Sequence, residues 1–202
     1  MKIIKINLNK VLQDDIDLIA DYLKCGQVIA YPTDTVYGLG CNAGTAAAVK
    51  KIRKIKGDRT NKPRLALVSG WKMLKKYCRV SREQMKYLKK IWPGKVTIIL
   101  TPAEAGQKEK ITPAEAGQKN NEGLAVRLPK NDFLIKIISQ AGFPLVSTSL
   151  NRQGEKPLTS VKSLAKHFKY LPDLAIDAGE IKGRPSSIVD LRDVKNIKII
   201  RK

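Results

Sequence analysis

Helical and strand-like apolar patterns alternate along the 202 residues of this chain, and this alternation restricts its fold more than any other feature. Apolar residues at helical spacing predict helices, and short apolar runs between turn signals predict strands. The predicted helices begin near Asp14, Thr45, Ser81, Asn131 and Ser160, and the predicted strands are 28–31, 65–68, 96–100, 124–128, 145–147, 175–176, 188–191 and 197–200. The sequence therefore predicts an α/β layer fold with a largely buried, twisted sheet. We expect Asp14 or Asp15 to cap the first helix.

The predicted elements belong to one domain over residues 1–202, because no linker rich in Gly, Ser or Pro divides them. One segment is unusual: the octapeptide Thr-Pro-Ala-Glu-Ala-Gly-Gln-Lys at 101–108 recurs unchanged at 112–119. A connection of this length between strands is uncommon in a compact domain. We therefore expect 101–122 to be a duplicated, flexible loop within the domain.

The composition argues against several classes of protein. No apolar run approaches the roughly 18 residues that a membrane span needs. The N-terminus lacks the apolar region of a signal peptide, so we expect a cytoplasmic protein. Three widely spaced cysteines and a single histidine, His167, argue against a disulfide framework, a zinc site and a histidine-centred triad.

The chain is strongly basic, with 39 Lys and Arg against 18 Asp and Glu and a formal net charge of +21. A field of this sign attracts polyanions such as RNA, DNA or nucleotides. Much of the excess is lysine on predicted helix surfaces, where solvated charge is ordinary. The charge is therefore compatible both with RNA contact and with a lysine-rich background.

The segment Tyr31-Pro-Thr-Asp-Thr-Val-Tyr-Gly-Leu-Gly40 follows a predicted strand and holds two hydroxyls around one carboxylate. Its glycines allow close approach of the backbone to a ligand, and its polar residues also suit a simple turn. Four other segments concentrate polar groups. They are the basic stretch 56–63, Arg127 within an apolar strand, the Ser-Thr-Ser-Leu-Asn run at 147–151, and Ser186 before another apolar strand. A cation in an apolar strand requires an anionic or hydrogen-bonding partner.

In order, the motifs Tyr-Pro-Thr-Asp-Thr-Val-Tyr-Gly, Lys-Gly with Lys-Pro, Trp-Pro-Gly, Ala-Val-Arg, Ser-Thr-Ser-x-Asn and Ser-Ser-Ile-Val-Asp resemble the YrdC/TsaC family of threonylcarbamoyl-AMP synthases. The resemblance runs from about residue 8 to the C-terminus. It implies a YrdC-like open, twisted, mixed sheet with helices packed around it and a basic concave face. It also implies a nucleotidyltransferase that makes L-threonylcarbamoyl-adenylate and pyrophosphate from L-threonine, bicarbonate and ATP, for modification of adenosine 37 in tRNA.

The resemblance implies a site that acts by positioning and electrostatics, with Lys56 and Arg59 as the candidates and no metal-binding residue. The implied threonine-binding residues are Thr35, Arg127 and Ser186. The implied ATP-binding residues are Lys56, Arg59, Lys62, Ser147, Ser149, Asn151 and Arg201. Mg²⁺ would accompany ATP, a separate threonylcarbamoyl transferase would use the product, and contact with tRNA is a further expectation.

The chain departs from the family pattern in its basic stretch, where Asp58 stands at the position of an arginine and Arg59 follows it. An anion beside phosphates is unfavourable in a partly dry site. We therefore expect either that Arg59 replaces the missing arginine or that the site is weakened. The alternative to an enzyme is a non-catalytic YrdC-like protein that binds RNA through the basic face.

Overall fold

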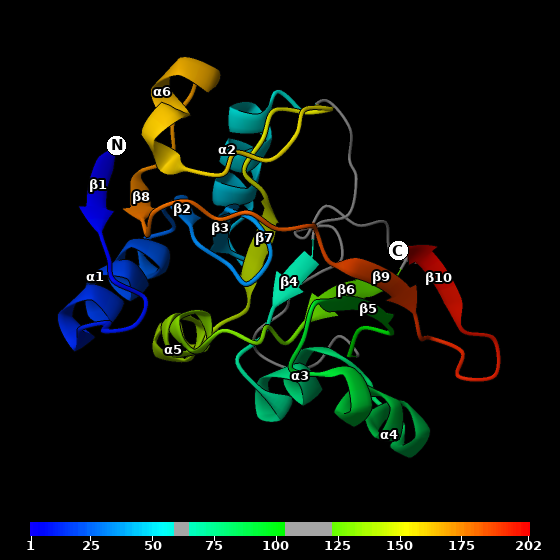
Figure 1. Ribbon diagram of the computed structural model, residues 1–202. Helices are drawn as coiled ribbons and strands as arrows, with labels where there is room; N and C mark the ends of the chain where they lie inside the picture. Colours follow the sequence, from blue (N-terminus) through cyan, green and yellow to red (C-terminus); the bar gives the residue numbers. More distant parts are fainter. Residues whose placement is uncertain (59–64, 104–122) are drawn as a thin grey trace.

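The computed structural model describes residues 1–58, 65–103 and 123–202. Within these residues ten strands form one mixed sheet in the order β1-β8-β2-β3-β7-β4-β6-β5-β9-β10 (Figure 1). The strands are β1 (Lys2–Lys5), β2 (Ile29–Tyr31), β3 (Gly38–Asn42), β4 (Leu65–Leu67), β5 (Val96–Leu100), β6 (Leu124–Arg127), β7 (Leu145–Ser149), β8 (Leu174–Asp177), β9 (Ser187–Asp190) and β10 (Lys198–Arg201). The sheet confirms the predicted mixed α/β class, and β1 and β10 lie at its two edges.

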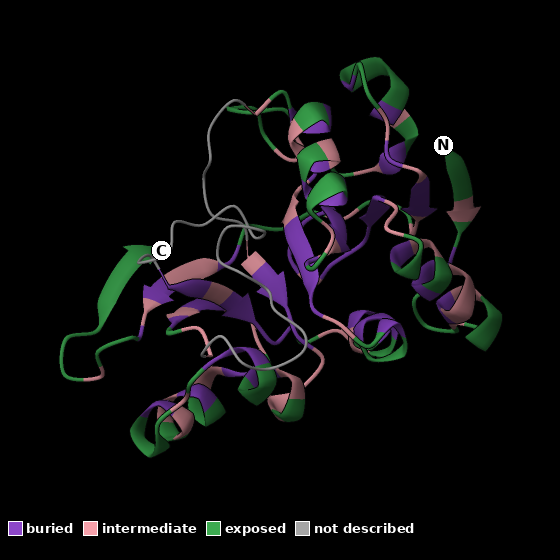
Figure 2. Ribbon diagram, turned by 180° about the vertical axis from the view of Figure 1, so that it is seen from behind, coloured by how far each residue is buried: buried purple, intermediate pink, exposed green. Residues whose placement is uncertain are grey.

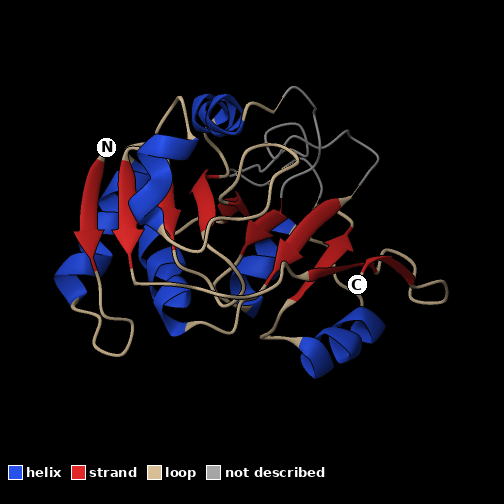
Figure 3. Cartoon of the chain, turned by 45° about the horizontal axis from the view of Figure 1, so that its top comes forward, coloured by secondary structure: helices blue, strands red, loops and turns tan. Residues whose placement is uncertain are grey.

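The helices lie against this sheet, and Figure 3 shows them beside the row of strands. They are α1 (Gln13–Lys24), α2 (Ala46–Lys56), α3 (Trp71–Tyr77), α4 (Arg82–Ile91), α5 (Asp132–Ala141) and α6 (Leu164–His167), with a 3₁₀ turn η1 (Val161–Ser163) before α6. No helix in the described part of the chain is long and apolar enough to cross a membrane.

Local sequence signals explain where several helices begin and end. Ser81 accepts a hydrogen bond from the Gln84 backbone and Gln84 bonds back to Ser81, which makes a capping box at α4. Asn131 caps α5 through its side chain, as its position predicts. The expected cap by Asp14 or Asp15 is wrong, because α1 begins after Leu12 and both aspartates lie in its first turn. There they still complement the positive end of the helix dipole.

The core has two apolar clusters on opposite faces of the sheet. Neighbouring residues of a strand point to opposite faces. Accordingly Tyr31 and Leu145 belong to the cluster that contains α1 and α5, whereas Ala30 and Val146 belong to the cluster that contains α2. In Figure 2 the buried residues are concentrated in the strands and on the inner sides of the helices, while β10 is exposed. Each face of the sheet is therefore covered by its own helices.

Several boundaries differ from those predicted by apolar periodicity. β1, β3 and α3 were not predicted: β3 contains two glycines among its five residues, and β1 is only four residues long, with two isoleucines between two lysines at a largely exposed edge. The helix predicted over 160–168 is divided into η1 and the short α6. β7 continues to Ser149, two residues beyond the predicted end at Ser147, so Ser149 also lies within the strand.

Candidate functional site

A cavity of about 460 Å³ lies on the α1/α5 face of the sheet. It is on this face because Ser147 and Ser149 alternate with Val146 and share the orientation of Leu145. Its lining combines apolar side chains with hydroxyls and two arginines. The lining residues are Thr33, Thr35, Val36, Tyr37, Gly38, Leu65, Thr97, Ile99, Ala125, Arg127, Ser147, Thr148, Ser149, Pro185, Ser186, Ile188, Ile200 and Arg201.

Tyr31 crosses from β2 over β3 to β7 at the base of this site. Its hydroxyl donates to Ser147 Oγ at 2.6 Å. The ring lies over Gly38 and Gly40, where an added Cβ would come within 2.9 Å and 2.8 Å of ring carbons. These glycines make room for the tyrosine ring, and Gly38 also lines the cavity. Burial raises the pKa of Tyr31 well above its usual value, so the phenol stays a neutral donor that orients Ser147.

The loop after β2 holds its hydroxyls in a fixed network. Thr33 Oγ1 donates to the carbonyl of Val36 at 2.6 Å and accepts from the backbone N–H of Thr35 at 3.0 Å. Thr33 Oγ1 also accepts from the backbone N–H of Val36 at 3.2 Å, and either hydroxyl can donate across the 2.9 Å contact between the two Oγ1 atoms. With either donor, Thr35 Oγ1 keeps a lone pair that is not used in this contact. Thr35 Oγ1 therefore offers the cavity an acceptor.

Arg127 and Asp34 form an ion pair that is almost completely buried. Arg127 Nη2 lies 2.7 Å from Asp34 Oδ1, and the side chains are 3% and 7% exposed. Burial lowers the pKa of Arg127, and the Asp34 carboxylate partly offsets that effect. Arginine nevertheless remains charged, because its pKa lies far above neutrality. Its Nε–H is buried and has no hydrogen-bond partner among the described residues, and Arg127 itself lines the cavity.

The opposite wall of the cavity joins β5, β9 and β10. Thr97 and Ser186 are 1% and 4% exposed, and their hydroxyl oxygens lie 2.8 Å apart. Arg201 donates from Nε and Nη2 to the Ser186 carbonyl at 3.0 Å and 2.6 Å. Thr97 was not among the predicted site residues. The sequence feature that could have identified Thr97 is its position as the one hydroxyl residue in an otherwise apolar strand.

Lys56 at the end of α2 lies behind this cavity and is only 5% exposed. Its Nζ donates to the carbonyls of Ser149 and Asn151, both at 2.7 Å, and to Asn151 Oδ1 at 3.0 Å. Ser149 Oγ in turn donates to Asn151 Oδ1 at 2.5 Å. In this structure Lys56 therefore fixes the end of β7, and its expected contact with ATP stays a prediction.

The predicted site residues divide into three groups. Those that line the cavity together are Thr35, Arg127, Ser147, Ser149, Ser186 and Arg201. Lys56 and Asn151 form the adjoining network. Arg59, Lys62 and most of the duplicated 101–122 segment lie outside the described residues. Asp58 lines a separate depression with Lys50 and Lys54, so this carboxylate is not in the cavity wall.

The sequence model of the Sua5/YciO/YrdC family, described as "Telomere recombination", matches residues 21–202. The chain belongs to this family. A threonylcarbamoyl-AMP synthase of Pyrococcus abyssi is 30% identical over 191 residues, which cover 93% of this chain and 54% of that protein. One of Bacillus subtilis is 33% identical over 170 residues, covering 84% of this chain and 46% of that protein. The chain thus spans about half the length of these relatives.

The fold is similar to a crystal structure of Pyrococcus abyssi Sua5 in complex with L-threonine. The TM-score is 0.80 at 29% sequence identity, over 94% of this chain and 54% of that chain. This chain therefore shares its fold with a protein whose structure was solved in complex with L-threonine.

Proposed function

We propose that this chain is a threonylcarbamoyl-AMP synthase, converting L-threonine, bicarbonate and ATP into L-threonylcarbamoyl-adenylate, pyrophosphate and water. The observation that carries the proposal is the cavity in which Thr35, Arg127 and Ser186 converge, in a fold similar to that of a relative solved with threonine. The threonine nitrogen would first form a carbamate with bicarbonate. A carbamate oxygen would then attack the α-phosphate of ATP and displace pyrophosphate.

The cavity offers complementary groups for each part of threonine. The guanidinium of Arg127 suits a carboxylate, because charge-assisted hydrogen bonds from a guanidinium are strong. Thr35 Oγ1 is an acceptor and suits an amine or hydroxyl hydrogen. The apolar side chains of Ile99, Ala125 and Ile188 suit the methyl group. The amino acid would then lie beside Ser186, the third predicted threonine-binding residue.

ATP would lie toward the end of β7, where Ser147, Ser149 and Asn151 are held in place by Tyr31 and Lys56. Arg201, Arg59 and Lys62 complete the proposed ATP-binding set. Preorganised donors and cations stabilise the charge that develops as pyrophosphate leaves.

We also propose that Mg²⁺ enters with ATP. Among the described residues, no cluster of three or more His, Cys, Asp or Glu side chains could hold a metal ion. A Mg²⁺ ion that is bound by phosphates and water does not require such a cluster. When bound, the ion would neutralise triphosphate charge. The product would pass to a separate transferase that acts on tRNA, and we propose that the protein works in the cytoplasm.

The decisive experiment measures pyrophosphate release with ATP and Mg²⁺, adding threonine and bicarbonate separately and together. Release should require both. Thr35→Val keeps the shape of the side chain and removes the acceptor, so kcat/KM for threonine should fall at least about tenfold. The control is Thr101→Val, because Thr101 is exposed and lies outside the cavity. Folded protein that shows no dependence on threonine would refute the proposal.

A further inference from the structure

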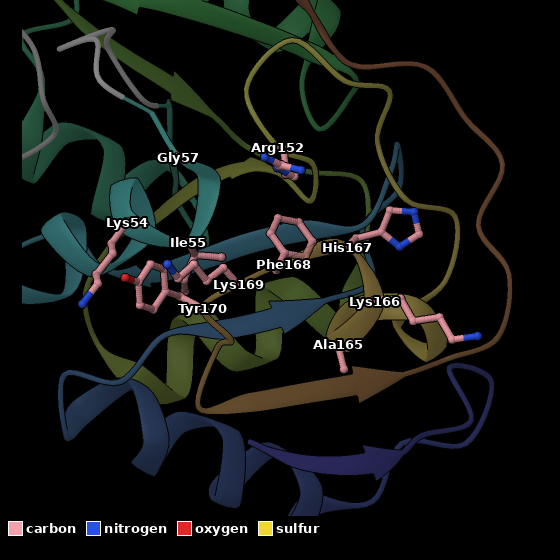
Figure 4. Close-up of a pocket in the computed structure, with 10 residues that line it drawn as sticks. All are labelled: Lys54, Ile55, Gly57, Arg152, Ala165, Lys166, His167, Phe168, Lys169 and Tyr170. Atoms are coloured by element: carbon pink, nitrogen blue, oxygen red, sulfur yellow. The ribbon is translucent and has the colours of Figure 1, made fainter.

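A second cleft, of about 450 Å³, lies on the opposite face of the sheet and shares no lining residue with the substrate cavity. Ile55 and Phe168 in its wall belong to the α2 cluster of the core. The cleft is formed by the last turn of α2, the segment 165–170 that includes the end of α6, and Arg152 (Figure 4). It is lined by Lys54, Ile55, Gly57, Arg152, Ala165, Lys166, His167, Phe168, Lys169 and Tyr170.

Two ammonium groups in this cleft gather at one aromatic ring. Lys54 Nζ lies 4.2 Å from the centroid of the Tyr170 ring, and Lys169 Nζ lies 5.9 Å from the same centroid. Figure 4 shows Lys54 beside that ring, whereas Lys166 points away from it. The ring attracts each cation, but the two positive charges repel one another. An anion between them would relieve that repulsion.

None of the described residues that line the cleft is a carboxylate. Of its cations, Arg152 has a carboxylate near it, with Nε at 3.7 Å from Glu155 Oε1, and both side chains are largely exposed. Such an exposed pair contributes little and can be exchanged for another anion. Lys54 and Lys169 are exposed and form no ion pair within the described residues. The cleft therefore presents cations without built-in counterions.

The positive surface continues beyond the cleft along α2. An adjoining depression shares Lys54 and Gly57 with it and adds Lys50 at an exposed position, with Asp58 as the one carboxylate among its described lining residues. A single phosphate group cannot contact lysines in both depressions, but a polymer with one negative charge per repeating unit can. Such a polyanion is also what the net charge of +21 attracts.

We propose that this basic cleft binds the phosphate backbone of a single-stranded nucleic acid, with Lys54 and Lys169 each neutralising a phosphate and Tyr170 holding the two ammonium groups in place. A lysine ammonium binds phosphate as a point charge. It lacks the two parallel N–H donors with which an arginine guanidinium recognises a planar carboxylate. The proposal does not rest on the proposed enzymatic activity, because none of these residues belongs to the substrate cavity.

The test measures fluorescence anisotropy of labelled oligouridylate, with oligothymidylate to distinguish RNA from DNA, over a range of NaCl concentrations. The double variant Lys54→Glu, Lys169→Glu should bind about tenfold more weakly or worse. Its plot of log K against log salt should become shallower by about 1.4, since each lost phosphate contact on a single strand removes about 0.7. Tyr170→Leu should also weaken binding, whereas Tyr170→Phe, which keeps the ring, should not.

The matched control is Lys89→Glu, Lys90→Glu, which makes the same change in net charge at exposed positions of α4. Equal losses in the two double variants would overturn the proposal, because they would show an unlocalised charge effect. Displacement of the oligonucleotide by oligoaspartate of equal charge and at equal concentration would also overturn it, in favour of an acidic protein partner. Far-ultraviolet circular dichroism and thermal unfolding check that each variant is folded.

Discussion

At the scale of the residue, the site depends on charges and hydroxyls whose partners are already in place. Arg127 is buried beside Asp34, and Ser147 is oriented by Tyr31. A buried cation costs several kcal/mol unless it is paired, so Asp34 is required before any substrate arrives. The Nε–H of the arginine has no partner among the described residues, and the arginine lines the cavity where a ligand would bind. The same pair therefore serves both the fold and the proposed binding of threonine.

The first prediction follows from that pair. Asp34→Asn removes the counter-charge of Arg127 and should lower the free energy of unfolding by about 3 kcal/mol, the cost of an unpaired buried charge. Urea unfolding measures this change. Asp21→Asn is the control, because the Lys24–Asp21 pair has side chains 46% and 69% exposed and should contribute little. Similar losses in both variants would contradict a special role for the buried pair.

At the scale of the element, the segment between β8 and β9, residues 178–186, brings distant parts of the site together. We name it the strap. The Tyr37 hydroxyl donates to the carbonyl of Gly179 at 2.7 Å and accepts from the backbone N–H of Ala178 at 3.0 Å. Further along, Gly183 passes so close to Thr35 that an added Cβ would lie 1.8 Å from the Thr35 carbonyl oxygen. The strap therefore holds the loop that carries Thr35.

The second prediction tests this contact. Gly183→Ala must displace either the strap or the Thr35 carbonyl, since no Cβ fits at that distance. Its kcat/KM for threonine should fall at least about tenfold, because shifts of about 1 Å at a positioned group have effects of that size or more. Gly70→Ala is the matched control, as an added Cβ there meets nothing within 4 Å. Unchanged threonine kinetics in Gly183→Ala would show that the strap does not position the loop.

The elements also show how far the sequence predicts the structure. Apolar periodicity identified the buried residues of α1, namely Ile16, Ile19, Ala20 and Leu23. It missed β3, because two of the five residues in this strand are glycines. They have no side chain to add to an apolar pattern, and they make room for the ring of Tyr31 from the neighbouring strand. That requirement is a tertiary contact, and no local pattern encodes it. Thr97 was missed for a similar reason, since its partner Ser186 is 89 positions away along the chain.

At the scale of the whole molecule, the two faces of the sheet present different sites. The α1/α5 face holds the cavity with its paired arginine, and the α2 face holds the basic cleft. Both sites favour negatively charged ligands, and the net charge of +21 adds a long-range attraction. The same charge has a cost, because like charges on a compact chain repel one another. Stability and ligand attraction should therefore respond to salt in opposite directions.

The last prediction concerns the effect of salt on the stability of the fold. Raising NaCl from about 10 mM to about 150 mM shortens the Debye length from roughly 30 Å to roughly 8 Å. Self-repulsion should weaken, and the melting temperature should rise by a few degrees, equivalent to about 1 kcal/mol. The exposed ion pairs should not reverse this trend, because each contributes little.

The variant Lys89→Glu, Lys90→Glu supplies the internal check, since it lowers the net charge by four at exposed positions of α4. It should melt at a higher temperature than the parent protein at low salt, and its melting temperature should change less on addition of NaCl. Differential scanning calorimetry at matched pH measures both. A melting temperature of the parent that falls with added salt would show that attractive pairs, rather than the excess of 39 basic over 18 acidic residues, dominate its electrostatics.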